Sequence, residues 1–250
     1  MMKIGIEKPY AFSEIGKRAN NEDCIFPEKE CADEHNKLYI VCDGMGGYDK
    51  GEIASSIVCK TLSASLSNCE IIDKAIFKQA LDEAYDRLDE ECENAGTTLT
   101  LLHLSEKGAF LAHMGDSRIY HLRKNGHHTE ILYKSDDHSF VNELVKLGII
   151  TPEKALTHPK RNIVTRVIQA NQATRDEADI YETYDVKEND YFFLCTDGVL
   201  ESISDEKLCS IINLDICLEK KCQMIEDICN KTSKDNYSAY LIAVNNVETR

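Results

Sequence analysis

The chain has 250 residues, 42% of them hydrophobic, so it is long enough to bury a substantial core in one large domain. Its 44 acidic residues outnumber its 29 basic residues, and the net charge of −15 argues against nucleic acid or an anionic membrane surface as a partner. The N-terminal residues do not resemble a signal peptide, no apolar run is long enough to span a bilayer, and the 11 cysteines contain no Cys-x-x-Cys pair. We therefore expect a soluble, cytoplasmic, monomeric protein without disulfides.

Short apolar runs that end at turn residues predict strands along most of the chain. In chain order these strands cover residues 3–6, 10–14, 24–27, 37–42, 97–104, 109–114, 117–123, 130–133, 180–184, 190–195 and 238–244. Turn-forming sequences at 106–108 and 124–126 separate neighbouring runs and favour antiparallel hairpins.

Three segments between the strands carry apolar residues at helical spacing, at 53–66, 72–88 and 214–228. Each segment has a single apolar face, which is typical of a helix that covers one side of a sheet. The composition and these patterns favour one compact domain over residues 1–250.

Several acidic residues lie at the ends of the apolar runs. Asp43 and Asp197 each follow such a run and precede a glycine. The same placement recurs beside other runs, at Glu22, Asp23, Asp116 and Asp235. A single Asp-Gly after a strand is equally typical of a turn, but several carboxylates gathered by the fold would form an oxygen-ligand site for a hard divalent cation.

Seven segments occur in the order found in the metal-dependent serine/threonine phosphatases of the protein phosphatase 2C family, which the chain resembles over nearly its whole length. They are residues 17–23, 41–52, 95–100, 114–120, 137–166, 194–198 and 235–236. The segment 137–166 resembles the flap of the bacterial branch. The resemblance implies an α+β fold, a four-layer α/β/β/α sandwich of two antiparallel sheets packed face to face with helices outside, and a flap at about 135–175.

The resemblance also implies a role for each acidic motif. Asp43 would bridge two Mg²⁺ or Mn²⁺ ions, with the Gly44 carbonyl on the first ion. The remaining ligands would be Asp197 and Asp235 on the second ion, Glu22 through a coordinated water, and Asp116 with Asp197 on a weaker third ion. Asp23 and Asn236 would support these ligands, and Gly46 and Gly47 would let the backbone approach them closely.

Arg18 is expected to clamp the phosphate, because a guanidinium grips two phosphoryl oxygens at once. The alternative for Arg18 is an exposed side chain before a strand. In the flap, the resemblance singles out His138, Ser139, Thr165 and Arg166. His138 is the nearest motif histidine, and both a structural and a catalytic role are open for it.

The chain departs from the family pattern at two places. Many eukaryotic members have a histidine, a candidate general acid, where this chain has Met45, which cannot donate a proton. A glycine usually follows the position of Ile168 at the flap exit, where this chain reads Gln169-Ala170-Asn171, and its loss is expected to stiffen or redirect the exit.

These observations predict a Mg²⁺- or Mn²⁺-dependent protein serine/threonine phosphatase, a phosphoric monoester hydrolase. As in the family, a hydroxide that bridges the metals would attack phosphorus directly, without a phosphoenzyme. Its partners would be phosphorylated proteins, among them a serine/threonine kinase and that kinase's substrates. The alternatives are a non-catalytic phosphoprotein-binding module of the same fold and a metal phosphomonoesterase for small molecules.

Overall fold

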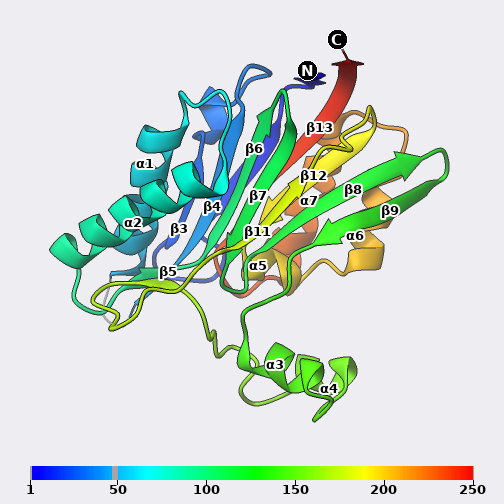
Figure 1. Ribbon diagram of the computed structural model, residues 1–250. Coiled ribbons are helices and arrows are strands. Elements are labelled where there is room, and N and C mark those ends of the chain that lie inside the picture. The colour runs from blue at the N-terminus through cyan, green and yellow to red at the C-terminus, as the bar shows by residue number, and fades with distance from the viewer. Residues whose placement is uncertain (1, 47–49, 250) are drawn as a thin grey trace.

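Two antiparallel sheets pack face to face in the computed structural model, which describes residues 2–46 and 50–249 (Figure 1). Within this described part, one sheet has six strands. Their order is β1 (Met2–Ile6), β13 (Tyr237–Thr249), β12 (Asp190–Cys195), β8 (Arg118–Asn125) and β9 (His128–Lys134), with β2 (Tyr10–Glu14) also paired to β13. The predicted antiparallel hairpins are confirmed, since β8 and β9 pair through the turn after Asn125.

The other sheet has seven strands among the described residues and carries the acidic motif around Asp43. Their order is β10 (Ile168–Gln169), β5 (Gly96–Thr97), β4 (Leu38–Met45), β6 (Leu99–Ser105), β7 (Gly108–Met114) and β11 (Asp179–Thr183), with β3 (Asp23–Phe26) also paired to β4. Strand β4 does not end at Cys42, as the apolar run predicted, because its pairing continues through Gly44 and Met45 to β5. Asp43 therefore lies inside a strand, and the expectation that it ends one is wrong.

Helices cover the outer faces of both sheets (Figure 1). The seven-stranded sheet packs against α1 (Gly51–Leu66) and α2 (Lys74–Glu91), and the six-stranded sheet against α6 (Asp205–Ile212) and α7 (Leu218–Thr232). A one-turn helix, α5 (Asp197–Leu200), and a 3₁₀ turn, η1 (Lys29–Cys31), complete the body. None of the described helices is long and apolar enough to cross a membrane.

Three apolar cores separate the four layers of the described structure. Val58 and Leu62 of α1 pack against the seven-stranded sheet, and Leu208 of α6 and Ile225 of α7 pack against the six-stranded sheet. The third core lies between the sheets, where the Tyr39 ring meets Tyr240 edge-on at 5.2 Å between centroids. The predicted α/β/β/α sandwich is thereby confirmed, because alternate side chains of each strand enter different cores.

The helix boundaries near the C-terminus differ from those predicted. The segment 214–228 was predicted to be helical throughout, but its first residues form a connection. Leu214 and Ile216 are 39% and 37% exposed, and α7 starts only at Leu218. Helix α6 was not predicted, although Ser204 caps it by accepting a hydrogen bond from the Lys207 N–H. Eight residues are too few for periodicity to distinguish a helix from a strand.

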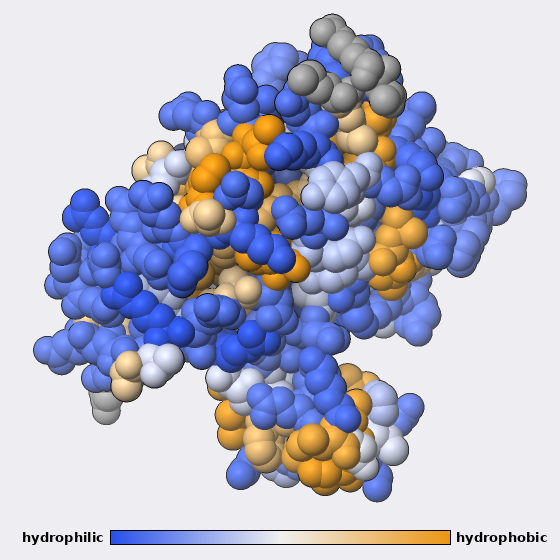
Figure 2. Space-filling view, viewed as in Figure 1, coloured by the Kyte–Doolittle hydropathy of each residue, from blue (hydrophilic) through white to orange (hydrophobic). Residues whose placement is uncertain are grey.

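The segment between β9 and β10 leaves the sandwich and forms a small projecting unit (Figure 1). It contains α3 (Phe140–Lys146), capped by Ser139, and α4 (Pro152–Leu156), capped by Thr151. Apolar side chains gather on its surface (Figure 2), including Leu147 and Leu156, which are 72% and 76% exposed. We call the projecting residues 137–166 the flap.

Candidate metal centre

Strands β3 and β4 bring two carboxylates of the candidate site together. Their antiparallel register places Asp23 directly opposite Asp43. The chain before β3 stays close to β4, because the Gly44 N–H donates a 3.1 Å hydrogen bond to the Glu22 carbonyl. A side chain at Gly44 is excluded, since a Cβ there would lie 2.1 Å from the Gly51 carbonyl oxygen. This close packing explains the glycine after Asp43.

Thr98, between β5 and β6, holds Asp43 in place. The Asp43 N–H donates to Thr98 Oγ1 at 3.0 Å, and the Thr98 N–H donates to the Asp43 carbonyl at 2.9 Å. The Thr98 hydroxyl also lies 2.6 Å from Ser117 Oγ, in the turn that carries Asp116. One buried threonine thus connects the Asp43 strand to the Asp116 turn.

The C-terminal half of the chain supplies Asp197, at the start of α5, and Asp235, just before β13. The segments that carry Asp197 and Asp235 can pack closely because Gly198 has no side chain; a Cβ there would lie 1.9 Å from the Asn236 carbonyl oxygen. The buried Asn236 side chain accepts from the Glu22 N–H at 2.9 Å and donates to the carbonyls of Ile15 and Asn20, both at 2.8 Å. Asn236 therefore ties the C-terminal acidic motif to the N-terminal one.

Mutual repulsion shows that the carboxylates share one site. Burial, followed by the charges of Asp23 and Asp197, raises the pKa of Asp43 well above its usual range. Burial is likewise the main cause that raises the pKa of Asp23 and of Asp116 to about 7, and that of Asp197 to about 6. The charge of at least one other carboxylate of the set also raises the pKa of each of these groups. Such a cluster is unfavourable in its fully charged form unless a cation neutralises it.

The donor atoms fit a hard divalent cation. They are carboxylate oxygens, the ligand type that Mg²⁺ and Mn²⁺ prefer. Asp23 Oδ2 accepts a hydrogen bond from the Thr196 hydroxyl at 3.1 Å, whereas Asp23 Oδ1 is buried with no hydrogen-bond partner among the described residues. An unpaired buried carboxylate oxygen is costly, and a cation or its bound water would satisfy it.

Arg18 lies at the mouth of the site. Its side chain is 54% exposed, and Nη2 lies 2.5 Å from Asp235 Oδ2. This hydrogen bond raises the pKa of Arg18, and the charges of Glu22 and Asp197 act in the same direction. A cation group with an exposed face beside a carboxylate cluster is well placed to meet an incoming phosphate.

The structure brings together all the predicted site residues outside the flap that it describes. Around the cluster lie Arg18, Glu22, Asp23, Asp43, Gly44, Asp116, Asp197, Asp235 and Asn236. Gly47, expected beside the site, lies outside the described residues.

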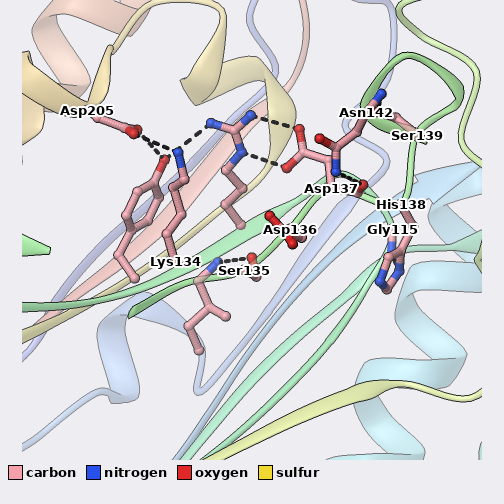
Figure 3. A network of polar contacts seen from close by, with 12 residues as sticks. Gly115, Lys134, Ser135, Asp136, Asp137, His138, Ser139, Asn142 and Asp205 are labelled. Atoms are coloured by element: carbon pink, nitrogen blue, oxygen red, sulfur yellow. Dashed lines mark hydrogen bonds and ion pairs between the residues drawn. The ribbon is translucent and has the colours of Figure 1, made fainter. Parts of the chain in front are cut away.

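The four flap residues lie instead at the base of the flap. Ser139 caps α3, the Thr165 N–H donates to the His138 carbonyl at 2.7 Å, and Arg166 pairs with Asp179 at 2.9 Å. Asp137, His138, Ser139 and Asn142 lie close together where the chain leaves β9 (Figure 3).

Several supporting residues were not singled out from the sequence. Thr98 and Thr196 hold the acidic residues, and Arg118 makes a two-bond pair with Asp137 at 2.6 and 2.7 Å. The charge of Asp137 also contributes to the raised pKa of Asp116. All four residues lie inside recognised motifs, which is the signal that could have pointed to them, although nothing distinguishes Thr98 from its threonine neighbours in the segment 95–100.

Comparisons with known proteins agree with this geometry. A family model described as protein phosphatase 2C matches residues 13–241. A putative protein phosphatase 2C-type from Streptococcus pyogenes serotype M6 is 34% identical, over 96% of this chain and 97% of the relative. The Mycobacterium tuberculosis serine/threonine phosphatase PstP/Ppp superimposes with a TM-score of 0.80 at 27% identity, over 96% of this chain and 100% of the other. A structure of the PstP catalytic domain in complex with two manganese ions gives a TM-score of 0.77 at 25% identity, with 98% and 100% covered.

Proposed function

Because this chain belongs to the protein phosphatase 2C family, we propose that it removes phosphate from phosphoserine and phosphothreonine in proteins, using divalent cations held by its carboxylate cluster. The observation that carries the proposal is the meeting of Asp43, Asp197 and Asp235 with Arg18, from segments far apart in the sequence. A binding module would not need a buried cluster of carboxylates in which Asp23 Oδ1 has no hydrogen-bond partner among the described residues, because such a cluster costs stability.

The proposed ligands are Asp43, Asp197 and Asp235, with the Gly44 carbonyl and Glu22, and with Asp116 at a weaker position. Bound cations would neutralise the phosphate oxygens and lower the pKa of a coordinated water. Asp23 supports this set through its pairing opposite Asp43, and Asn236 through its bond to the Glu22 backbone. Mg²⁺ and Mn²⁺ both suit oxygen ligands, and the manganese-bound neighbour favours Mn²⁺.

Arg18 would hold the substrate. Its guanidinium pairs with Asp235 while more than half of the side chain's surface is exposed, so it can exchange one carboxylate oxygen for two phosphoryl oxygens. A cation on Asp235 would weaken the Arg18–Asp235 pair by competing for the same oxygen. Arg18 would then be available to the phosphate only when the site is loaded.

His138 is not proposed as the general acid that replaces the histidine absent at Met45. Both of its ring nitrogens are engaged, one by the Gly115 N–H at 3.1 Å and the other by Asp179 at 3.0 Å. Its side chain is also only 3% exposed. The engaged ring of His138 therefore leaves protonation of the leaving group to a water at the loaded site or to another flap residue.

The flap is proposed to contact the protein part of the substrate, within a single catalytic domain over residues 1–250. Its exposed Leu147 and Leu156 lie on a unit that also carries Lys154 and Lys160, in a chain of net charge −15. Apolar and basic groups together suit a phosphorylated, acidic polypeptide. A serine/threonine kinase and its substrates are the partners that this chemistry favours.

The decisive experiment measures phosphate release from a phosphothreonine peptide and from a small aryl phosphate, each with and without Mn²⁺. We expect both substrates to be hydrolysed only with the metal, with the higher kcat/KM for the peptide. Hydrolysis of the small ester alone would identify a small-molecule phosphomonoesterase. Peptide binding without turnover would identify a binding module.

A further inference from the structure

His138 binds both backbone groups of a single residue next to the candidate site. The His138 ring Nδ1 accepts a hydrogen bond from the Gly115 N–H at 3.1 Å, and the His138 backbone N–H donates to the Gly115 carbonyl at 2.8 Å. Figure 3 shows the two residues side by side. Gly115 directly precedes Asp116, so His138 fixes both ends of the peptide units that carry this carboxylate.

Gly115 needs such support. Its φ of +104° is open only to glycine, and a Cβ there would lie 2.5 Å from Thr98 Cγ2. Because Gly115 has no Cβ, sterics restrict the φ and ψ angles of the residue before Asp116 less than they would for any other residue. Its conformation depends on the hydrogen bonds that it makes.

The bond from Gly115 also determines the tautomer of His138. Because Nδ1 accepts a hydrogen, the proton of the neutral ring must be on Nε2. Nε2 lies 3.0 Å from Asp179 Oδ2, which accepts that proton's hydrogen bond. Burial lowers the pKa of His138, which favours the same neutral ring.

Asp179 is in turn held by the flap. Arg166 donates to its two carboxylate oxygens at 2.9 and 3.2 Å, and the His138 carbonyl accepts the Thr165 N–H at 2.7 Å. Although burial opposes it, hydrogen bonds from Arg166 and His138 lower the pKa of Asp179 to about 2. A continuous set of bonds thus runs from the end of the flap to the Asp116 turn.

The same cluster is not a second metal site, although ligand atoms of His113, His138 and Asp179 lie within 4.8 Å of one another. A cation on His138 Nε2 would displace its proton while Nδ1 still accepts from Gly115, which would require an imidazolate ring. The guanidinium of Arg166 already neutralises Asp179. Both features oppose a cation there.

We propose that His138 is a positioning residue, which couples the flap exit, through Asp179 and Arg166, to the Gly115–Asp116 turn of the metal centre. This inference rests on the proposed function, and it adds that occupancy of the Asp116-dependent cation position depends on the flap. A flap that moved with bound substrate would pull on Asp179 and so adjust Asp116.

Two substitutions separate the halves of this connection. His138→Asn keeps an oxygen near the place of Nδ1 to accept from Gly115 but is too short to reach Asp179. His138→Gln keeps an amide donor toward Asp179 but has no acceptor for the Gly115 N–H. Asp136→Asn is the matched control, since exposed Asp136 lies in the same loop and forms an ion pair with Lys146 at 3.1 Å.

The first readout is Mn²⁺ binding by calorimetry. We expect His138→Gln to weaken the position that is lost in Asp116→Asn by about 10-fold, the low end for loss of an outer-shell partner, and His138→Asn, which loses only the link to the flap, to weaken it by a smaller factor, while Asp136→Asn leaves it near wild type. Equal Mn²⁺ binding in wild type, Asp116→Asn and His138→Gln would overturn the proposal. Thermal unfolding of each variant checks that the fold is kept.

The second readout is a double-mutant cycle on turnover. If His138 acts through Asp116, His138→Gln should add nothing to the loss caused by Asp116→Asn, whereas independent structural damage would multiply the two losses. Additive effects would therefore contradict the coupling.

Imidazole ¹⁵N shifts supply a test that needs no activity. We expect the Nε2–H tautomer of His138, and an Nδ1–H tautomer would rule the arrangement out. Wild-type protein without metal-dependent turnover, but with the expected shifts and Mn²⁺ titrations, would refute the proposed function and leave the coupling intact.

Discussion

Arg18 and Asp235 are 217 positions apart in the chain, yet Arg18 Nη2 lies 2.5 Å from Asp235 Oδ2. The pair joins the proposed phosphate clamp to a proposed cation ligand. Because the Arg18 side chain is 54% exposed, a cation on Asp235 would free its guanidinium for an incoming phosphate. Substrate grip and metal loading are thereby linked at one side chain.

Removing the Arg18 guanidinium should weaken catalysis without emptying the cation site. We expect Arg18→Ala to reduce kcat/KM by about 2 to 4 kcal/mol of transition-state stabilisation, the typical value of one charge-assisted clamp. Arg18→Lys should recover only part of this, because an ammonium cannot make the two-bond contact. Lys17→Ala is the control, and an unchanged kcat/KM in Arg18→Ala would remove Arg18 from the site.

Loss of any one core carboxylate should be far more severe. Asp43→Asn, Asp197→Asn and Asp235→Asn each remove a charged ligand, and we expect a fall in kcat of more than about 100-fold, since a bound cation contributes several kcal/mol. Steady-state kinetics at saturating Mn²⁺ provide the measurement. Exposed Asp227→Asn on α7 should behave as wild type. Near-normal turnover in a folded Asp43 variant would be incompatible with the proposed ligand set.

Cation binding should release protons in mildly acidic buffer. The pKa of Asp116 is raised to about 7 and that of Asp197 to about 6 without metal, so at about pH 6 Asp116 is largely and Asp197 partly protonated, and both must lose protons to bind a cation. A raised folded-state pKa also means that their favourable contribution to stability, present below pH 4, is lost as pH rises through about 6 for Asp197 and about 7 for Asp116.

Calorimetry in buffers of different ionisation enthalpy measures this release. We expect the enthalpy of Mn²⁺ binding to depend on the buffer at about pH 6 and to depend on it less at about pH 8.5, where Asp116 and Asp197 are already ionised. Heats that do not depend on the buffer at the lower pH would show that the carboxylates are already ionised.

Asn171 should be sensitive to its backbone conformation. Asn171 ends the stretch Gln169-Ala170-Asn171, which stands where the family usually has a glycine after Ile168. It takes a left-handed φ of +57°, while its side-chain amide donates to the Cys92 carbonyl at 3.0 Å. Asn171→Ala should lower the free energy of unfolding by about 1 kcal/mol more than Asn213→Ala, because alanine resists this conformation. Asn213 is the matched control, since its amide donates to the His127 carbonyl at 2.8 Å from an ordinary helical backbone.

The comparison is made by chemical denaturation. Asn171→Gly should lose less stability than Asn171→Ala, because glycine adopts the left-handed conformation without strain. Equal losses in Asn171→Ala and Asn213→Ala would show that only the amide bond matters.

The apolar surface of the flap should matter for phosphoproteins alone. We expect the double change Leu147→Asn and Leu156→Asn to lower kcat/KM for a phosphopeptide, by about 10-fold if each side chain loses its contact, and to spare a small aryl phosphate. Tyr184→Asn serves as the control, because Tyr184 is 67% exposed outside the flap. A parallel fall for both substrates would place the flap in the catalytic machinery.

Local patterns in the sequence were sufficient to predict most elements and most of the site. Strands such as β2 and β12 were predicted to the residue, because their short apolar runs lie close to turn residues, Pro9 and Gly16 for β2 and Asp197-Gly198 for β12. The acidic motifs were recognisable as ligands because their order along the chain matches that of a known family. Helix α6 and the start of α7 could not be predicted from the sequence, since short apolar stretches do not distinguish a helix from a connection.

Only the tertiary structure decided how distant residues meet. Asp43 lies within β4 rather than at its end because β5 pairs with the residues after it, a contact that no local pattern contains. Thr98 is marked only by its bonds to Asp43 and Ser117, and His138 by its bonds to Gly115 and Asp179. The sequence by itself thus determined which side chains have the chemistry of the site, because residue type and alternation are local properties. Hydrogen bonds and charge interactions depend on separation in space, so packing of the two sheets decided which residues hold those side chains in place.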